Sequence, residues 1–494
     1  MDKLPVIDLA VLVVFLIGTV GLGCSFALRK RNSDQFMAGR RSLPGWAVGL
    51  SMFGSYVSSI SFLANPSKSF ASNWNPFVFS LATPLAALVA VVWFVPFYRR
   101  LGNISAYEHL ERRFGAWART YAVGCFLLTQ TARMGTVVYL LALAVSPLTG
   151  WDVTTLILLT GSLMIVCTIF GGMEATVWIG VVQSLVLIAG PLICMAVLIV
   201  QMPAGLPGIV QTGAEAGKFS LGSYSWSLDE PTFWVVLAYG LAINLGNFGI
   251  DQSYVQRYLT TPTDAEAKRS VWLTAGLYVP VAAFFFLIGT GLFALYSARP
   301  ELFSGIDAPQ QPDKVFPYFI AHQLPLGMSG LVVAAIFAAS LDSSLGSMAT
   351  LTLCDLYKRY LRPQASDQDS LHVLRASTLI WGLLGMHAAL AMIRVKHALD
   401  VWWELAGIFS GGMLGLFLLG LISKRASRGP ALLAVFVGLL VIVWMSLSPK
   451  DYWPALLDGF RSPMHAFLVP VVGTLTILCV GLLATWALGR SQRP

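Results

Sequence analysis

Charge is scarce in this sequence. Of its 494 residues, 11% are Asp, Glu, Lys or Arg and 56% are hydrophobic, with a mean hydropathy of +0.72. Soluble globular domains carry roughly 25% charged residues, so this composition excludes an ordinary soluble protein and predicts a chain surrounded by lipid. Polar stretches are also short. The longest, around 203–231 and 298–325, cannot build a hydrophobic core, and we expect no soluble domain.

Paired cysteines and phosphate-binding loops are absent as well. The six cysteines stand singly in apolar runs, without the spacing of a metal site or a disulfide framework. The sequence has no Gly-rich loop followed by a lysine, which argues against an ATP-driven pump or an enzyme. The net charge of +8 could indicate a nucleic-acid partner, but the basic residues lie mostly in loops between apolar runs, so we expect none.

Long apolar runs fill most of the chain. A helix needs about 20 mostly apolar residues to cross a membrane, and the runs and their breaks predict an all-α, polytopic membrane protein with about thirteen spans. The first run is too long for a signal-peptide core and is predicted to remain as a span. The approximate limits are 5–28, 44–72, 75–98, 116–147, 151–170, 174–201, 232–256, 270–297, 326–357, 371–393, 399–422, 429–447 and 463–488.

The basic residues favour one orientation of these spans. An odd number of spans puts the termini on opposite sides, and cytoplasmic loops carry an excess of Lys and Arg. Most of the 32 Lys and Arg residues, including those at 29–31, 40–41 and 99–100, lie in loops that are cytoplasmic if the N-terminus is outside. We therefore predict a multi-pass protein of the plasma (inner) membrane with its N-terminus outside and its C-terminus in the cytoplasm.

Two spans contain interruptions that a lipid-facing helix would not tolerate. The second contains the serine-rich run 54–61, followed by Asn65-Pro66. The seventh contains Gly240, Asn244, Gly246, Asn247 and Gly249. Backbone groups freed by a break must be satisfied by protein, water or an ion, and broken spans in corresponding positions indicate a transporter binding site. The alternative is that these small residues only allow close helix packing.

The interrupted spans divide the chain into two similar halves. Each begins a set of five spans, 44–201 and 232–422, and an odd number of spans per set gives the sets opposite orientations, as in an inverted repeat. Residues 1–43 would form an extra first span and a cytoplasmic loop, 202–231 a periplasmic loop, and 423–494 two extra C-terminal spans. We expect the solute and ion sites near the middle of the membrane, between the repeats.

Arg133 is a charge well inside the predicted fourth span. A charge at the centre of a bilayer costs at least about 2.5 kcal/mol, so it needs a reason. The planar guanidinium suits a carboxylate, which favours a clamp on an anionic solute. The alternative is a structural ion pair with Asp342 or Glu404, and the sequence leaves both open.

Hydroxyl groups and one carboxylate gather in the predicted ninth span, within the run Ala338 to Ser347. Its serines, which are three or four residues apart, share one helix face. Such oxygen ligands suit an alkali cation, with backbone carbonyls of a broken helix completing the shell. The alternative is hydrogen bonding between helices, worth only about 1 kcal/mol each. Asp342 favours an ion. The serines are Ser340, Ser343, Ser344 and Ser347.

Three short motifs, taken in their order and spacing, resemble the sodium/solute symporter family over nearly the whole chain. They are Arg41-Ser42-Leu43-Pro44-Gly45-Trp46 before the first broken span, Gly171-Gly172-Met173-Glu174-Ala175 before the sixth, and Asp251-Gln252-Ser253-Tyr254-Val255-Gln256-Arg257 ending the seventh. The pattern is closest to the bacterial sialic acid and sodium/glucose cotransporter branches. The resemblance implies a five-plus-five inverted repeat, the leucine-transporter-like fold, with extra helices at both ends.

The resemblance also implies a sodium site between the first and eighth core helices. By position, its ligands would be the backbone carbonyls of Gly54, Val57 and Ile336 and the side chain of Ser340. The family often has a second hydroxyl where this chain has Ala339. Together with the serine run, the candidate ion-binding residues are Gly54, Val57, Ile336, Ala339, Ser340, Asp342 and Ser343.

Some members of the family bind a second sodium ion with an aspartate in the sixth span. That position is Gly180 in this chain, so the carboxylate is missing. Asp342 stands where those members have a ligand serine. One hypothesis is therefore that the negative charge has moved across the site and still holds a second sodium ion.

The sialic acid branch resembles this chain at Ser58, Ser61 and Arg133, where the arginine would meet the carboxylate of a sugar acid. Tyr56, Pro76 and Ser80 stand where that branch leads us to expect threonine, an aromatic residue and glutamine. The candidate solute-binding residues are Tyr56, Ser58, Ser61, Ser80, Arg133 and Asn247.

These features predict a sodium-coupled secondary active symporter, working as a monomer, that imports a small polar solute by alternating access. A sugar or a sugar acid such as sialic acid fits best, and another organic anion or a neutral sugar is the alternative. A sensor built on a transporter scaffold would add a soluble signalling domain. A sodium channel would need a continuous polar pore, which the mostly apolar spans do not provide.

Overall fold

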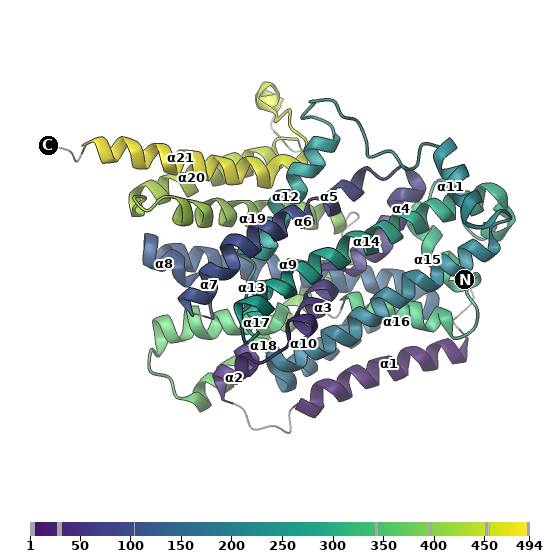
Figure 1. Ribbon diagram of the computed structural model, residues 1–494, viewed down its shortest axis with the longest axis horizontal. Coiled ribbons are helices and arrows are strands. Elements are labelled where there is room, and N and C mark those ends of the chain that lie inside the picture. Colours follow the sequence, from purple (N-terminus) through teal and green to yellow (C-terminus); the bar gives the residue numbers. More distant parts are fainter. Residues whose placement is uncertain are drawn as a thin grey trace.

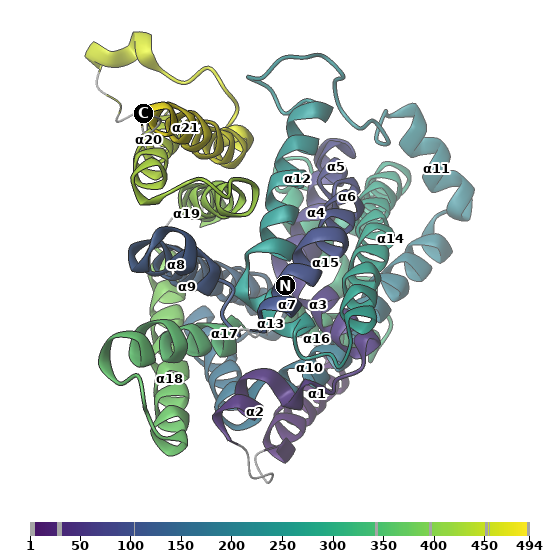
Figure 2. The same ribbon diagram turned by 60° about the vertical axis from the view of Figure 1, so that its left-hand side comes forward.

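The computed structural model describes residues 5–26, 32–102, 104–340, 344–394, 398–449, 453 and 455–491. Within these ranges the chain forms helices and connecting turns, without strands. The long helices run in roughly one direction across the molecule (Figure 1). Both views place the C-terminal helices along one edge of the bundle and the first helix along the opposite edge (Figure 2).

The helices of the first half begin with an extra helix and end with the longest one. They are α1 (Val6–Ser25), α2 (Ser33–Ala38), α3 (Gly45–Tyr56), α4 (Ser59–Ala71), α5 (Val78–Leu81), α6 (Thr83–Val89), α7 (Val95–Leu101), α8 (Glu108–Phe114), α9 (Ala116–Thr149) and α10 (Val153–Gln201). A π-helical stretch, η4 (Ala90–Phe94), joins α6 to α7. The short elements from α5 to α7 therefore belong to one span.

The second half follows a short helix, α11 (Gly205–Glu215), that lies between the predicted repeats. The π-helical stretch η6 (Thr352–Leu361) continues α17. The helices are α12 (Phe233–Gly249), α13 (Gln252–Tyr258), α14 (Asp264–Ala298), α15 (Pro312–His322), α16 (Met328–Ser340), α17 (Ser344–Leu351), α18 (Asp367–Met392), α19 (Ala398–Ile422), α20 (Arg428–Leu447) and α21 (Val469–Ser491).

The predicted spans all fall on these helices. In the described ranges, nine helices are long and apolar enough to cross a membrane, and the two bent pairs, α3 with α4 and α12 with α13, raise the number to eleven. This number counts the 49-residue α10 once, although α10 holds two predicted spans. It leaves out α19, of which the part Phe409–Ile422 is apolar but shorter than a full span. Counting these two helices as the sequence does gives the thirteen predicted spans.

Gly172 divides α10 into its two spans. Its φ of +58° lies in the left-handed region that favours glycine, and a Cβ atom here would come within 3.0 Å of the Phe36 carbonyl oxygen. Gly23 of α1 lies against both Cys167 and Ile179, one residue from each limb. The chain therefore turns back at Gly172, as the predicted limits 151–170 and 174–201 require.

Both predicted breaks exist, but one lies beyond the residues that suggested it. The α3–α4 pair bends by 54°, and the chain leaves helical geometry between Tyr56 and Ser59, inside the predicted run. The α12–α13 pair bends by 52°, yet α12 runs unbroken through all five Gly and Asn positions and ends at Gly249. Those small residues instead permit close packing, because a Cβ atom at Gly240 would come within 2.9 Å of the Phe79 backbone.

The extra first helix is fastened to the second half through Asp8. This residue is 1% exposed, and its Oδ1 accepts hydrogen bonds from the backbone N–H groups of Gly327 (2.9 Å) and Gly330 (2.6 Å). A carboxylate at a helix N-terminus satisfies N–H groups that have no partner within the helix and interacts favourably with the helix dipole. Asp8 thus caps α16, the helix that carries three of the seven predicted ion-binding residues, Ile336, Ala339 and Ser340.

Candidate functional site

A cavity of about 770 Å³ lies between the two bent helix pairs. Residues of the loop before α12, such as Gly222 and Glu230, line its mouth, whereas Arg133 and Asp251 line it near the two breaks. The walls come from α3, α4, α5, α9, α12, α13, α14, α19 and α21. The structure brings all six candidate solute-binding residues to this cavity: Tyr56, Ser58, Ser61, Ser80, Arg133 and Asn247.

Arg133 reaches the cavity because of the helical spacing along α9. Phe126, Gln130, Arg133 and Val137 recur every three or four residues, which puts them on one face, and all four line the cavity. The Nη2 group of Arg133 donates a hydrogen bond of 2.9 Å to the carbonyl oxygen of Ser55. The arginine therefore binds the backbone at the break in the second span. Asp342 and the side chain of Glu404, the predicted alternative partners, lie outside the described residues.

Tyr56 forms an aromatic wall where α3 ends. Its ring lies 5.3 Å from that of Phe248 and 5.1 Å from the rings of both Tyr254 and Tyr278, measured between centroids. The Tyr56 hydroxyl faces Asn247, and the hydroxyl of Tyr278 faces Ser80. An aromatic face flanked by short polar groups suits a solute that has an apolar face and hydroxyl groups at its edge.

The two serines after the break begin α4. Ser58 caps the helix, with its Oγ accepting from the N–H of Ser61 at 3.4 Å, and the two hydroxyls lie 3.5 Å apart. The N-terminus of a helix presents N–H groups and a partial positive charge. Because Ser58 and Ser61 line the cavity, this end of α4 offers hydrogen-bond donors to an anionic or polar solute.

Asp251 is a cavity residue that the candidate solute-binding and ion-binding sets did not include. It lies at the bend between α12 and α13, where its carboxylate accepts from the Gln130 Nε2 (2.8 Å) and from the N–H of Ser253 (2.7 Å). An Asp directly after the glycine-rich span is a typical N-cap of a new helix. That pattern was the available signal for both the bend and the position of the carboxylate.

Two of the seven predicted ion-binding residues, Ala339 and Ser340, line a second, much smaller cavity, whereas Gly54, Val57 and Ile336 do not. It measures about 10 Å³, and Ser58, Arg133, Ala339 and Ser340 are among the residues that line it. This is near the space needed for a single water molecule. Ser340 is fully buried and donates to the Ile336 carbonyl at 3.0 Å. The break in the second span therefore lies beside the end of α16. Asp342 and Ser343 are outside the described residues.

Gly180 packs directly against α3. A Cβ atom here would overlap the Ser51 hydroxyl and lie 2.9 Å from the Ser51 Cα atom. One turn further, the Ser184 hydroxyl donates to the Leu50 carbonyl at 2.6 Å, and a Cβ atom at Gly54 would lie 2.6 Å from the Ser184 Oγ. Helices approach this closely in membranes through small residues. The space that a carboxylate would occupy at position 180 is filled by α3.

Two bent helix pairs that share a polar cavity are the arrangement expected of a secondary transporter. The model of the Sodium:solute symporter family matches residues 36–438, and the chain belongs to this family. It is thus a multi-pass membrane symporter that uses sodium as the coupling ion, and its relatives are transporters rather than enzymes.

Two bacterial relatives match almost the whole chain. The chain is 32% identical to a sodium/sialic acid symporter of Proteus mirabilis over 482 residues, covering 96% of this chain and 94% of that one. It is 33% identical to a sodium/sialic acid symporter of Aliivibrio fischeri over 479 residues, covering 96% and 91%.

A solved structure shares the fold in detail. This structure of a sodium-coupled sialic acid symporter, in a substrate-bound outward-open state, matches with a TM-score of 0.89 at 30% identity, over 97% of this chain and 98% of that one. The predicted leucine-transporter-like fold is confirmed.

Proposed function

We propose that the protein imports a small sugar acid together with sodium. The single observation that carries this proposal is Arg133, a cation that lines a polar cavity and also holds the Ser55 carbonyl at the break. A carboxylate that reaches Arg133 would therefore contact the helix whose movement opens and closes the path. A cavity of about 770 Å³ is large enough for a sugar acid. The relatives of this chain in Proteus mirabilis and Aliivibrio fischeri are named as sodium/sialic acid symporters.

Each cavity residue then has a role. Arg133 binds the carboxylate, because its planar donors match the two oxygens. Ser58, Ser61, Ser80 and Asn247 bind hydroxyl or amide groups of the solute. Tyr56 packs against the ring. The side chain of Ser80 is short and that of Tyr56 is large, so the solute need not be sialic acid itself, and another organic acid is the alternative within this proposal.

Sodium would bind between α3 and α16. Because α3 stops at Tyr56, its final carbonyls have no following turn to pair with. We assign the carbonyls of Gly54, Val57 and Ile336 and the hydroxyl of Ser340 as ligands. Ala339 adds no hydroxyl. With Gly180 packed against α3, any second sodium ion would depend on Asp342 and Ser343.

The transport cycle follows from alternating access. Residues 44–201 and 232–422 would form the two inverted repeats, with the N-terminus outside, the C-terminus in the cytoplasm, and the cavity mouth facing outward from the inner membrane of a monomer. Sodium would act through its different affinity for the outward and inward states. The membrane potential would add about 2.3 kcal/mol per charge per 100 mV to accumulation.

A proteoliposome uptake panel tests the proposal. Sialic acid, neutral sugars, amino acids and short carboxylates are supplied with and without a sodium gradient, to the wild type, Arg133→Ala and Lys314→Ala, whose residue is an exposed cation of α15. We expect sodium-driven uptake of an acidic solute that Arg133→Ala loses and Lys314→Ala keeps. Unchanged uptake of every solute by Arg133→Ala would refute the clamp.

A further inference from the structure

The chain between α7 and α8 forms hydrogen bonds with the bend between α12 and α13. The amide of Gln252, a fully buried side chain, is held on both sides: its Nε2 donates to the Ile104 carbonyl at 2.8 Å, and its Oε1 accepts from the Ala106 N–H at 2.8 Å. The next residue, Tyr107, donates its hydroxyl to the Ile250 carbonyl at 2.9 Å. The residues 104–107 thus contact the bend at three points.

A second tyrosine, Tyr98, also forms a hydrogen bond with the bend. The hydroxyl of Tyr98 donates to the Gly249 carbonyl at 2.7 Å. Gly249 ends α12, so the carbonyls of Gly249 and Ile250 have no partner in a continuing helix. Tyr98 and Tyr107 are 2% and 1% exposed, so water does not replace them in this state. The bent geometry therefore depends on hydroxyl groups from α7 and from the residue before α8.

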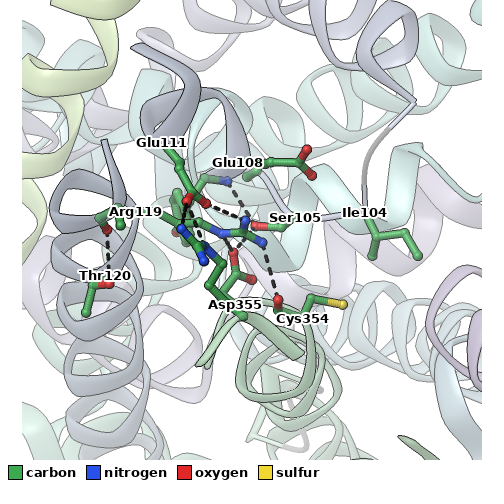
Figure 3. A network of polar contacts seen from close by, with 12 residues as sticks. Ile104, Ser105, Glu108, Glu111, Arg119, Thr120, Cys354 and Asp355 are labelled. Carbon is green, nitrogen blue, oxygen red and sulfur yellow. Dashed lines mark hydrogen bonds and ion pairs between the residues drawn. The ribbon is translucent and has the colours of Figure 1, made fainter. Parts of the chain in front are cut away.

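The same segment is tied on its other side to an ion-pair network. Ser105 donates to the Oδ1 of Asp355 at 2.7 Å, and Asp355 pairs with Arg119 of α9 (Figure 3). Glu111 of α8 joins Arg119 (2.8 Å) to Arg359 of η6 (2.6 Å). Residues 104–107 therefore lie between the bend and a set of helices, α8, α9 and η6, that these charges hold together.

The bend also faces the solute cavity. Asp251, between Ile250 and Gln252, lines the cavity and accepts from Gln130. One turn further along α13, the Gln256 Nε2 donates to the Met37 carbonyl at 2.8 Å. Asp251 thus lines the cavity, whereas its neighbours Ile250 and Gln252 make buried hydrogen bonds with residues 104–107. A movement of the bend changes both at once.

We propose that Gln252, Tyr98 and Tyr107, with residues 104–107, form an inner latch that keeps the solute path closed on the side opposite the cavity mouth. α12 runs from the mouth toward the bend, so an inward opening must move α13 away from residues 104–107 and break these hydrogen bonds. The latch rests on the proposed transport cycle. Its three named side chains are positioning residues, because they act on the bend and do not contact the solute.

Cys354 provides a reporter for the latch. It directly precedes Asp355, is half-buried, and its Sγ contacts the Met37 Sδ at 3.7 Å. In a parent chain whose other five cysteines are replaced by alanine, the rate at which a maleimide labels Cys354 is measured in detergent with and without sodium. The variants are Gln252→Leu, Tyr98→Phe and Tyr107→Phe. Gln310→Leu, which changes an exposed amide, is the matched control.

The latch predicts that in sodium Tyr98→Phe and Tyr107→Phe, which each lose one buried hydrogen bond, label about five- to tenfold faster than the parent. Gln252→Leu, which loses two, labels faster still. The Gln310→Leu control labels like the parent. The apparent affinity for a solute from the mouth side falls in proportion to the fraction of molecules that remain in the outward state. Tyr→Phe changes keep the aromatic packing and so separate the latch from misfolding.

Equal labelling rates in the parent and in all three monodisperse variants would overturn the latch. This result is distinct from a failure of the proposed function, which would appear as a parent chain without sodium-driven uptake of any solute. Faster labelling of the variants in such a protein would still support the latch, because the labelling assay requires no transported solute.

Discussion

The guanidinium of Arg133 donates a hydrogen bond to the carbonyl oxygen of Ser55, 2.9 Å away, at the end of α3. Arg257 of α13 binds the hydroxyl of the same serine and donates to the Ser51 carbonyl at 3.1 Å. Two cations from separate helices therefore hold the last turn of α3. Positive charges are favourable at the C-terminal end of a helix. A sodium ion that binds at this end of α3 would lie near the positive charge of Arg133, because Arg133 also lines the small cavity.

This arrangement predicts that sodium and an acidic solute bind cooperatively. A solute carboxylate that pairs with Arg133 would reduce its repulsion of sodium, so we expect the sodium affinity to rise about tenfold when the solute is bound. Arg133→Gln should raise the affinity for sodium alone and abolish the dependence on solute. Isothermal calorimetry in both orders of addition checks this. A lower sodium affinity in Arg133→Gln would contradict it.

Gly180→Ala should destabilise the protein. The added methyl would overlap the Ser51 hydroxyl and press on the α3 backbone, and overpacking of this kind costs about 1–3 kcal/mol. We expect a lower melting temperature in detergent and reduced uptake. Gly276→Ala is the matched control, because nothing lies within 4 Å of a Cβ atom at that position of α14. Equal melting of the two variants would show that α3 and α10 separate easily.

Asp8→Ala should loosen the first helix from α16. The change removes two hydrogen bonds to a carboxylate, each of the kind that contributes about 1.5–3 kcal/mol. We expect a lower melting temperature and faster proteolysis within α1. The control is Asp313→Ala, which removes an exposed carboxylate from the first turn of α15. The assignment of Asp8 as a cap fails if both variants melt like the wild type.

The network around Glu111 should weaken in acid. Burial alone would raise the pKa of Glu111, but hydrogen bonds and charge from Arg359 and Arg119 outweigh it and lower that pKa below the ordinary value of 4.5. A carboxylate whose pKa is lowered on folding stabilises the protein above its unfolded pKa, and this contribution disappears as the pH falls through the folded value. Stability should therefore drop below about pH 4.5.

The variant Glu111→Gln isolates this contribution. At pH 7 it should melt at a lower temperature than the wild type, whereas below the lowered pKa of Glu111 the two proteins should converge. Glu301→Gln, in the loop after α14, serves as a control for the loss of an exposed carboxylate. Melting curves from pH 7 to pH 3.5 give the comparison. A constant difference at every pH would mean that the charge of Glu111 is not what stabilises the network.

Hydropathy predicted the spans because the length of an apolar helix depends on the chain itself and on the thickness of the bilayer. The break near Ser58 was predicted from the serine-rich run 54–61, and in the structure the side chain of Ser58 caps the helix that begins there. The bend at Ile250 was placed too early, because glycine-rich α12 uses its small residues for packing against Phe79 and Phe94.

Other residues depend on partners far away in the sequence. Asp8 is explained only by the backbone of α16, and Gln252 only by residues 104–107. Asp251 enters the cavity because of the bend, which hydrophobic periodicity does not show and for which the N-cap pattern at Asp251 is the local signal. The candidate solute residues were named mainly from the resemblance to the sialic acid branch and from the intramembrane position of Arg133, and their roles remain predictions.

The cavity wall is completed by α21 and the segment before it, which lie outside the two predicted repeats. Thr474 and Pro470 of α21 and His465 before it line the cavity, and the ring of Phe467 stacks on Tyr239 of α12 at 4.8 Å. A chain shortened to the ten repeat helices would keep both bent pairs yet leave one flank of the solute chamber open to lipid tails. Selection for a new cargo could therefore act on the final helix while the ion-binding machinery stays untouched.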